Sequence, residues 1–175
     1  GYRMITSFRY GTGIVAGIPW FNIPWVRDEL ISLRGLVLIP KLYKDARRIL
    51  ETIFVYVRNG RVPNFFDGKT VTYNSIDSVP LFINSICDYV RESRDETLVD
   101  RYKDKIGSIF DYAFSRCDER GFLIAGPKET WMDTLDRSGA CVEIQALWHE
   151  MLANGMKLLE VQECGKPLGK LRENF

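Results

Sequence analysis

Apolar residues recur at helical spacing along most of the chain from residue 28 to residue 160. Such stripes predict amphipathic helices, because a helix brings positions three and four residues apart onto one face. Five helices are expected, over residues 28–39, 43–58, 76–92 (with Asn74 or Ser75 as the cap), 96–117 and 143–160. A sixth is expected after Pro167. No alternating run rich in Val, Ile and Thr predicts a β domain.

Two long stretches interrupt this helical pattern. Residues 1–24 are rich in Gly, Pro and aromatic residues, which indicates an irregular opening segment, a loop or a short strand. Residues 121–141 lose their periodicity in the same way. Helical hairpins joined by long loops predict an all-α fold, and residues 1–175 are expected to form one all-α domain or part of an α/α toroid.

The composition narrows the possible functions. With 24 Lys and Arg against 23 Asp and Glu, the net charge of +1 disfavours nucleic acid and membrane surfaces as partners. The four cysteines are widely spaced and there is one His, so we expect buried thiols and no metal site. No nucleotide-binding motif predicts a cofactor, and no apolar run predicts a signal or a membrane span. A cytoplasmic protein is therefore expected.

Three loops between the predicted hairpins combine aromatic residues with carboxylates, amides and arginine. Aromatic faces can stack on the C–H faces of sugars, while carboxylates, amides and arginine bind hydroxyl groups. Two carboxylates on opposite sides of a glycosidic bond could act as acid and base. The candidate residues are Trp20, Trp25, Arg27 and Asp28 in the first loop, Asn64, Tyr73, Asn74 and Asp77 in the second, and Trp131, Asp133 and Glu143 in the third.

Five of these residues also have a purely structural interpretation. Arg27 and Asp28 could form a surface pair at a helix start, where an acidic side chain is favoured by the helix dipole. Trp131 could be a core residue and Asp133 a turn residue. Glu143 could be an ordinary acid in the first turn of its helix. The residues alone leave these alternatives open.

Seven short segments occur in the same order as in the glucosidase domain of archaeal and bacterial glycogen debranching enzymes, which this chain resembles from about residue 14 to residue 155. The segments are AGIPWF (16–21), WVRD (25–28), ISLRGL (31–36), VPN (62–64), YNSID (73–77), ETWMD (129–133) and VEIQALW (142–148). The resemblance implies an (α/α)6 barrel that hydrolyses α-1,6-linked glucose stubs of an α-glucan, such as glycogen or limit dextrin, with inversion.

The resemblance also assigns roles to individual residues. It implies that Asp133 is the general acid, and that Arg27 and Asp28 hold the hydroxyl groups of the terminal glucose. The other residues implied to line the pocket are Tyr73, Asn74, Asp77, Trp131 and Glu143. The chain departs from the family at NIP (22–24), where a Gly-Arg-Asp run is more usual.

The length of the chain also departs from the family. Twelve helices with their loops need more than about 300 residues, so 175 residues are expected to supply about half a barrel. The family's general base would lie beyond Phe175, and this chain alone is then expected to be inactive. Self-association or a second chain could complete the barrel. The alternative is a glycan-binding or structural relative without a base.

Overall fold

The structure, a computed structural model, describes residues 4–158 and 160–174. The remaining positions of the predicted domain, including Leu159 near the end of the predicted fifth helix, lie outside this description. The strands are β1 (Ile5–Phe8), β2 (Gly11–Gly17), β3 (Phe21–Pro24), β4 (Phe65–Phe66) and β5 (Val71–Thr72). The α-helices are α1 (Val26–Leu33), α2 (Tyr43–Tyr56), α3 (Ser78–Ser93), α4 (Thr97–Ser115), α5 (Val142–Leu158) and α6 (Gly165–Asn174). A π-helix, η2 (Arg34–Leu38), and a 3-10 helix, η3 (Gln162–Cys164), complete the elements.

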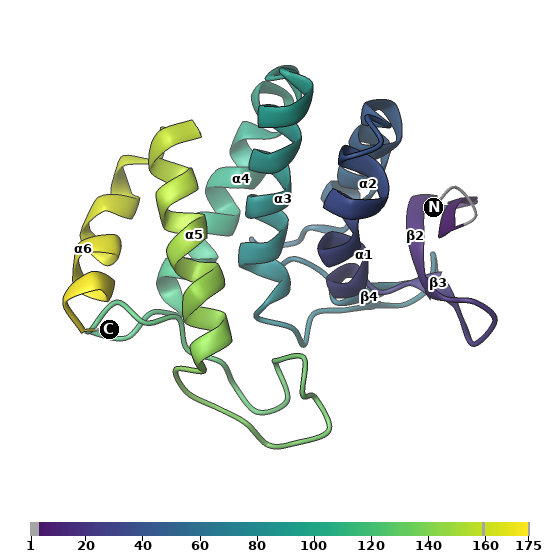
Figure 1. Ribbon diagram of the computed structural model, residues 1–175. Coiled ribbons are helices and arrows are strands. Elements are labelled where there is room, and N and C mark those ends of the chain that lie inside the picture. The colour runs from purple at the N-terminus through teal and green to yellow at the C-terminus, as the bar shows by residue number, and fades with distance from the viewer. Residues whose placement is uncertain (1–3, 159, 175) are drawn as a thin grey trace.

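The helices form two layers, as helical hairpins require. Helices α1, α3 and α5 stand side by side with their N-terminal ends at the same end of the molecule, and α2 and α4 lie behind them (Figure 1). Helix α6 and η3 pack on α5. The predicted helical hairpins are therefore confirmed, and the chain returns to the same end after each hairpin.

The predicted apolar stripes form one continuous core between the two layers. Phe54 of α2 packs on Phe82 of α3, with ring centroids 4.7 Å apart, and stacks on Tyr102 of α4 at 4.1 Å. Trp148 of α5 is fully buried, and its indole N–H donates to the carbonyl of Gly121 at 3.0 Å. Burial of aromatic rings of this size stabilises the fold more than any other interaction that these side chains make.

The prediction of a purely α-helical fold is wrong at the N-terminus. There β1, β2 and β3 form an antiparallel sheet, in which Ile5 pairs with Ile14 and Val15 pairs with Pro24. The sheet packs its middle strand on α1 and α2. Glycine permits this close approach, because a Cβ on Gly11 would lie 2.2 Å from Thr52 Cγ2. Short glycine-rich strands of this kind lack the alternation that marks a strand in sequence.

Three predicted helix starts and ends are corrected by the structure. The helix predicted over 28–39 begins at Val26 and continues as the π-helix η2. The third helix begins at Ser78, and neither Asn74 nor Ser75 caps it. Helix α6 begins at Gly165, before Pro167, because proline fits the first turn of a helix, where its missing N–H would have no partner.

The four cysteines are free. Cys87 and Cys164 are buried as predicted, whereas Cys117 and Cys141 are only partly buried. Burial raises the pKa of the Cys87 thiol to about 12, so this side chain stays a neutral thiol at physiological pH. None of the described helices is long and apolar enough to cross a membrane.

Candidate active site

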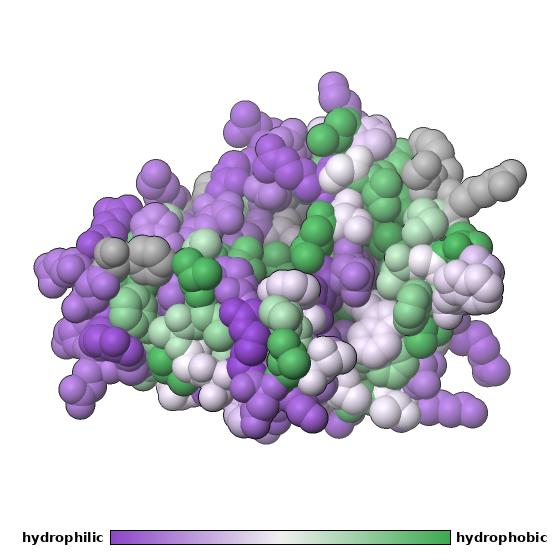
Figure 2. Space-filling model, turned by 60° about the horizontal axis from the view of Figure 1, so that its bottom comes forward, coloured by the Kyte–Doolittle hydropathy of each residue, from purple (hydrophilic) through white to green (hydrophobic). Residues whose placement is uncertain are grey.

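Most of the predicted site residues lie at the end of the molecule where α1, α3 and α5 begin. The loop of residues 116–141 and the β4–β5 hairpin lie at this same end (Figure 1). Figure 2 brings this end forward and shows small apolar and polar patches interleaved across it. Such a mixed surface suits a ligand that presents both C–H faces and hydroxyl groups.

Arg27, in the first turn of α1, forms a nearly buried ion pair with Asp77 at the start of α3. Arg27 Nε lies 2.7 Å from Asp77 Oδ2, and the two side chains are 13% and 4% exposed. Arg27 Nη2 also donates to Ser75 Oγ at 3.3 Å, and Ser75 Oγ donates to the other oxygen of Asp77. The hypothesis of a surface pair with Asp28 is thus wrong, since Asp28 is exposed and the pair joins two helices.

Trp25 and Asn64 lie beside this ion pair and hold α1 against the β4–β5 hairpin. The ring of Trp25 packs on Phe65 with centroids 5.0 Å apart, and Val26 N–H donates to the carbonyl of Asn64 at 3.0 Å. Asn64 Nδ2 donates to Asn74 Oδ1 at 3.3 Å. Trp25 Nε1 and Asn64 Oδ1 are buried without a partner among the described residues. Buried polar atoms normally make hydrogen bonds, so these two atoms are an exception to the usual pattern.

Glu29, next to the predicted pair, is a fully buried carboxyl that the sequence analysis did not single out. Its Oε1 accepts a hydrogen bond from Ile14 N–H of β2 at 2.7 Å, while Oε2 has no partner among the described residues. Burial raises its pKa from 4.5 to about 8, although the hydrogen bond from Ile14 opposes this. Glu29 is therefore neutral at pH 7 and joins the N-terminal sheet to α1. The sequence signal for Glu29 was an acidic residue within the apolar stripe of α1.

This burial makes stability depend on pH. Because the pKa of Glu29 is higher in the folded chain, the unfolded chain loses the proton first, and stability falls as pH rises from about 4.5 to 8. The slope is at most about 1.4 kcal/mol per pH unit, or about 2 kcal/mol between pH 6 and 7.5. Urea unfolding at both pH values should show this loss in the parent chain and little of it in Glu29→Gln. An equal dependence of the unfolding free energy on pH in the two proteins would show that Glu29 is not its source.

The third loop is fixed to the start of α3 by Glu129. Arg116 Nη2 lies 2.6 Å from Glu129 Oε2, which also accepts a hydrogen bond from Gly126 N–H at 2.7 Å. The carbonyl of Glu129 accepts from Ile76 N–H at 2.8 Å, one residue before Asp77. Burial would raise the pKa of Glu129, but Arg116 and the Gly126 N–H outweigh it and lower the pKa. The loop therefore lies beside the Arg27–Asp77 pair.

Trp131 and Asp133 follow this attachment directly. Trp131 is 58% exposed, so the interpretation of Trp131 as a core residue is wrong. Asp133 is partly buried, and its carboxyl makes no hydrogen bond or ion pair within residues 4–158 and 160–174. It is therefore available to a bound molecule.

Glu143, at the start of α5, has a different environment from Asp133. It forms an ion pair with Arg137, with Arg137 Nη1 2.8 Å from Glu143 Oε1. Burial would raise the pKa of Glu143, but its own backbone N–H, Arg137 and the Trp131 indole together lower it. Glu143 thus stays ionised at neutral pH, where it can accept hydrogen bonds but cannot donate a proton.

Two of the proposed sugar-binding residues are not brought into these clusters. Trp20 is 84% exposed on the turn between β2 and β3. The hydroxyl of Tyr73 donates to the carbonyl of Tyr56 at 2.7 Å, and the guanidinium of Arg61 covers its ring. Tyr73 therefore joins α2 to the second loop. The structure adds Ser75, whose place in the YNSID segment was its sequence signal, and pairs Arg137, an arginine of the third loop, with Glu143.

The chain is similar to known carbohydrate-active proteins in sequence and in structure. The family model for amylo-alpha-1,6-glucosidase matches residues 3–170. The glycogen debranching enzyme of Saccharomyces cerevisiae is 32% identical over 82 residues, which cover 44% of this chain and 5% of that protein. A rhamnosidase from Klebsiella oxytoca with rhamnose bound superposes with a TM-score of 0.65 at 15% identity, covering 91% of this chain and 33% of that one.

The structural similarity shows the fold alone, because the identity is low. The helical hairpins described above superpose on the rhamnosidase structure over 91% of this chain. The chain spans a third of that structure and a twentieth of the yeast enzyme. The family match, in contrast, covers almost all of the sequence. The chain therefore belongs to the amylo-alpha-1,6-glucosidase family of glycoside hydrolases.

Proposed function

We propose that this chain is part of an inverting glycosidase that removes α-1,6-linked glucose stubs from a glycogen-like α-glucan. The observation that carries the proposal is the position of Asp133. The Glu129 contacts hold its loop beside the Arg27–Asp77 pair, and Trp131 offers an exposed aromatic face two residues away. A carboxyl, a flat aromatic ring and hydroxyl-binding groups are the parts that glycoside hydrolysis needs.

Asp133 is the general acid in this proposal. Arg137 keeps Glu143 ionised and Arg116 keeps Glu129 ionised, so neither of these carboxylates is suited to donate a proton. Asp133 has no cation beside it in the described chain and is partly buried, whereas Asp136 on the same loop is exposed. Asp133 would protonate the glycosidic oxygen as the bond to the anomeric carbon breaks.

The hydroxyl groups of the terminal glucose would be held on the opposite side of the site. Arg27 Nε and Nη2 are used by Asp77 and Ser75, which leaves Nη1 without a partner among the described residues. The exposed carboxylate of Asp28 lies one residue away on α1. The fixed Arg27 guanidinium can donate to one sugar hydroxyl group, and the exposed Asp28 carboxylate is an acceptor for another.

An inverting reaction also needs a base about 6.5–9.5 Å from the acid, with a water between them. We propose that further helical hairpins supply it, since the chain spans a third of the related structure. A cavity of about 510 Å³ opens between α5 and α6, lined in part by Val142, Ala146 and Leu171. Val142 is 66% exposed there, which suits packing against another hairpin, from the same polypeptide, a second copy or another chain.

The test is glucose release from a branched limit dextrin by the protein with its barrel complete, followed by NMR. Inversion at an α-linkage yields β-glucose first. Release of α-glucose would contradict the inverting mechanism. Tight binding of the dextrin without any release would support the catalytically incomplete relative instead, and the absence of both binding and release would contradict both.

Trp131 provides a binding test that needs no base. Replacing Trp131 with Ala should weaken malto-oligosaccharide binding by roughly 10- to 150-fold, because loss of an aromatic face removes roughly 1.5–3 kcal/mol of apolar contact. Leu135→Ala is a matched control, since Leu135 is an apolar residue of the same loop and is 50% exposed. Isothermal titration calorimetry measures both. Equal affinities for the two variants would contradict the role of Trp131 as a sugar platform.

A further inference from the structure

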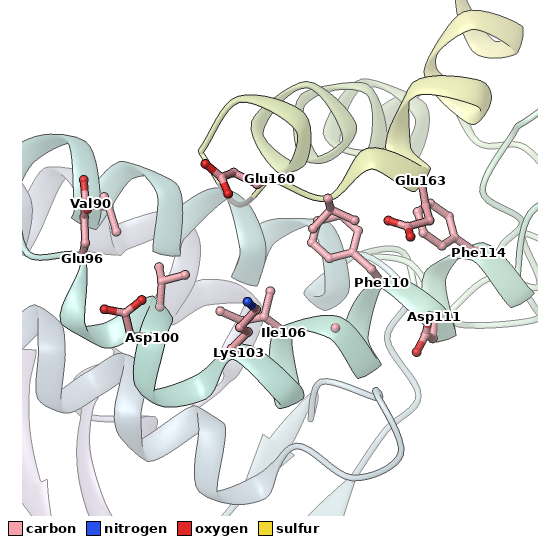
Figure 3. A pocket seen from close by; sticks show the side chains of 13 residues that line it. Val90, Glu96, Asp100, Lys103, Ile106, Phe110, Asp111, Phe114, Glu160 and Glu163 are labelled. Carbon is pink, nitrogen blue, oxygen red and sulfur yellow. The ribbon is translucent and has the colours of Figure 1, made fainter.

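A groove runs along α4 on a different part of the molecule from the candidate active site. It has a volume of about 520 Å³ and lies between α4 and the segment that follows α5 (Figure 3). Its floor is apolar. Val99, Gly107, Phe114 and Val161 are partly exposed on this floor, whereas Val90, Ile106 and Phe110 are buried beneath it. The groove includes the far end of α3, because Val90 lies in the last turn of that helix.

Acidic side chains surround this floor. In Figure 3, Glu160 and Glu163 extend from the segment after α5, and Asp100 and Lys103 lie on α4 opposite them. The acidic residues of the lining are Glu96, Asp100, Asp111, Glu160 and Glu163. Lys103 is the one cation among the described lining residues, and none of the five carboxylates forms an ion pair in the described chain. The rim is therefore strongly negative.

The C-terminal ends of two helices lie at this groove, and Lys157 in the last turn of α5 partly offsets the negative end of that helix. Helix α3 ends at Ser93 and α5 ends at Leu158, so the C-terminal ends of both helices lie at the groove. A helix C-terminus carries a partial negative charge from its unpaired carbonyl groups. Arg91, in the last turn of α3, is directed to Asp88 at 2.6 Å and to Asn154. Arg91 therefore pairs with groups other than the five carboxylates of the rim.

We propose that this groove binds a basic amphipathic helix of a partner protein. The lining runs from Glu96, just before α4, to Phe114 across a kink at Tyr102, a span of at most about 27 Å at 1.5 Å per residue. A helix of similar length can place apolar side chains on the floor at three-and-four spacing and Lys or Arg against the rim. The negative rim repels nucleic acids and anionic membranes, so a cationic peptide is the partner that the charge favours.

The test uses a labelled 18-residue peptide with Leu at helical spacing and Lys at most other positions. Fluorescence anisotropy should show binding at 50 mM NaCl that weakens strongly at 300 mM. The variant with Asp100→Asn, Glu160→Gln and Glu163→Gln should bind about 10-fold more weakly, since each exposed charge pair contributes little alone. The matched control changes Glu119→Gln, Asp136→Asn and Glu173→Gln, three exposed acids outside the groove, and should bind like the parent.

Three outcomes would overturn the proposal. The first is equal weakening by the two triple variants, which would indicate attraction to the net charge alone. The second is equal affinity for a scrambled peptide of the same composition, because the apolar floor requires the helical spacing of Leu. The third is the absence of peptide binding together with a dimer of this chain, detected by sedimentation velocity, that the triple variant of the groove disrupts. Circular dichroism verifies that both variants are folded.

Discussion

Replacing Asp133 with Asn should lower kcat/KM for glucose release from limit dextrin about 1,000-fold in the protein with its barrel complete. The reason is chemical, because the oxygen that leaves a glycosidic bond is a poor leaving group unless it is protonated. General acid catalysis typically contributes 10²–10⁴-fold. The amide of Asn has nearly the shape of the carboxyl but no acidic proton. Glucose assays at saturating and low substrate separate kcat from KM, and the effect should fall on kcat.

Two controls make this expectation specific. Asp136→Asn changes an exposed acid of the same loop and should leave the rate within about 2-fold of the parent, as expected for a surface residue without contacts. A glucosyl fluoride needs little protonation of its leaving group, so Asp133→Asn should retain most of its activity on that substrate. An equal loss on both substrates would show that Asp133 positions the loop rather than donating a proton.

The helices could be predicted because the buried face of each helix appears in the sequence as apolar residues at regular spacing. Phe82, Ile83 and Ile86 of α3 are fully buried and lie at three-and-four spacing. The N-terminal sheet shows no such spacing, because β2 contains Gly11 and Gly13. The strand instead depends on contacts with residues far along the chain. Thr52 and Glu29 approach these glycines from α2 and α1. The all-α prediction failed where tertiary contacts outweighed local preference.

The sequence names candidate site residues one by one, but it does not show how they are connected. Chemical type and family resemblance singled out Arg27 and Asp77, yet nothing local pairs residues 50 positions apart. The sequence places Asp28 next to Arg27, whereas the helix turns Asp28 to the surface and directs Arg27 towards α3. Neighbours in sequence point in different directions on a helix. The partner of a helical side chain therefore lies three or four positions away or on another element of the fold.

The Arg27–Asp77 pair should also be needed for stability. Arg27→Met should lower the free energy of unfolding by about 3 kcal/mol, because it leaves the carboxylate of Asp77, which is only 4% exposed, without its cation. Arg48→Met is the matched control, since Arg48 is 66% exposed in its ion pair with Asp45 and should cost less than about 1 kcal/mol. Urea unfolding followed by circular dichroism measures both values.

The double variant Arg27→Met with Asp77→Leu distinguishes the ion pair from the packing around it. Apolar residues of similar size can replace a buried ion pair at little cost, because neither charge is then left uncompensated. We therefore expect the double variant to recover most of the stability that Arg27→Met loses. It should nevertheless bind malto-oligosaccharides weakly, since the donor proposed for the sugar hydroxyl groups is gone. If the double variant were as unstable as the sum of the single changes, the pair would stabilise the site only through its packing.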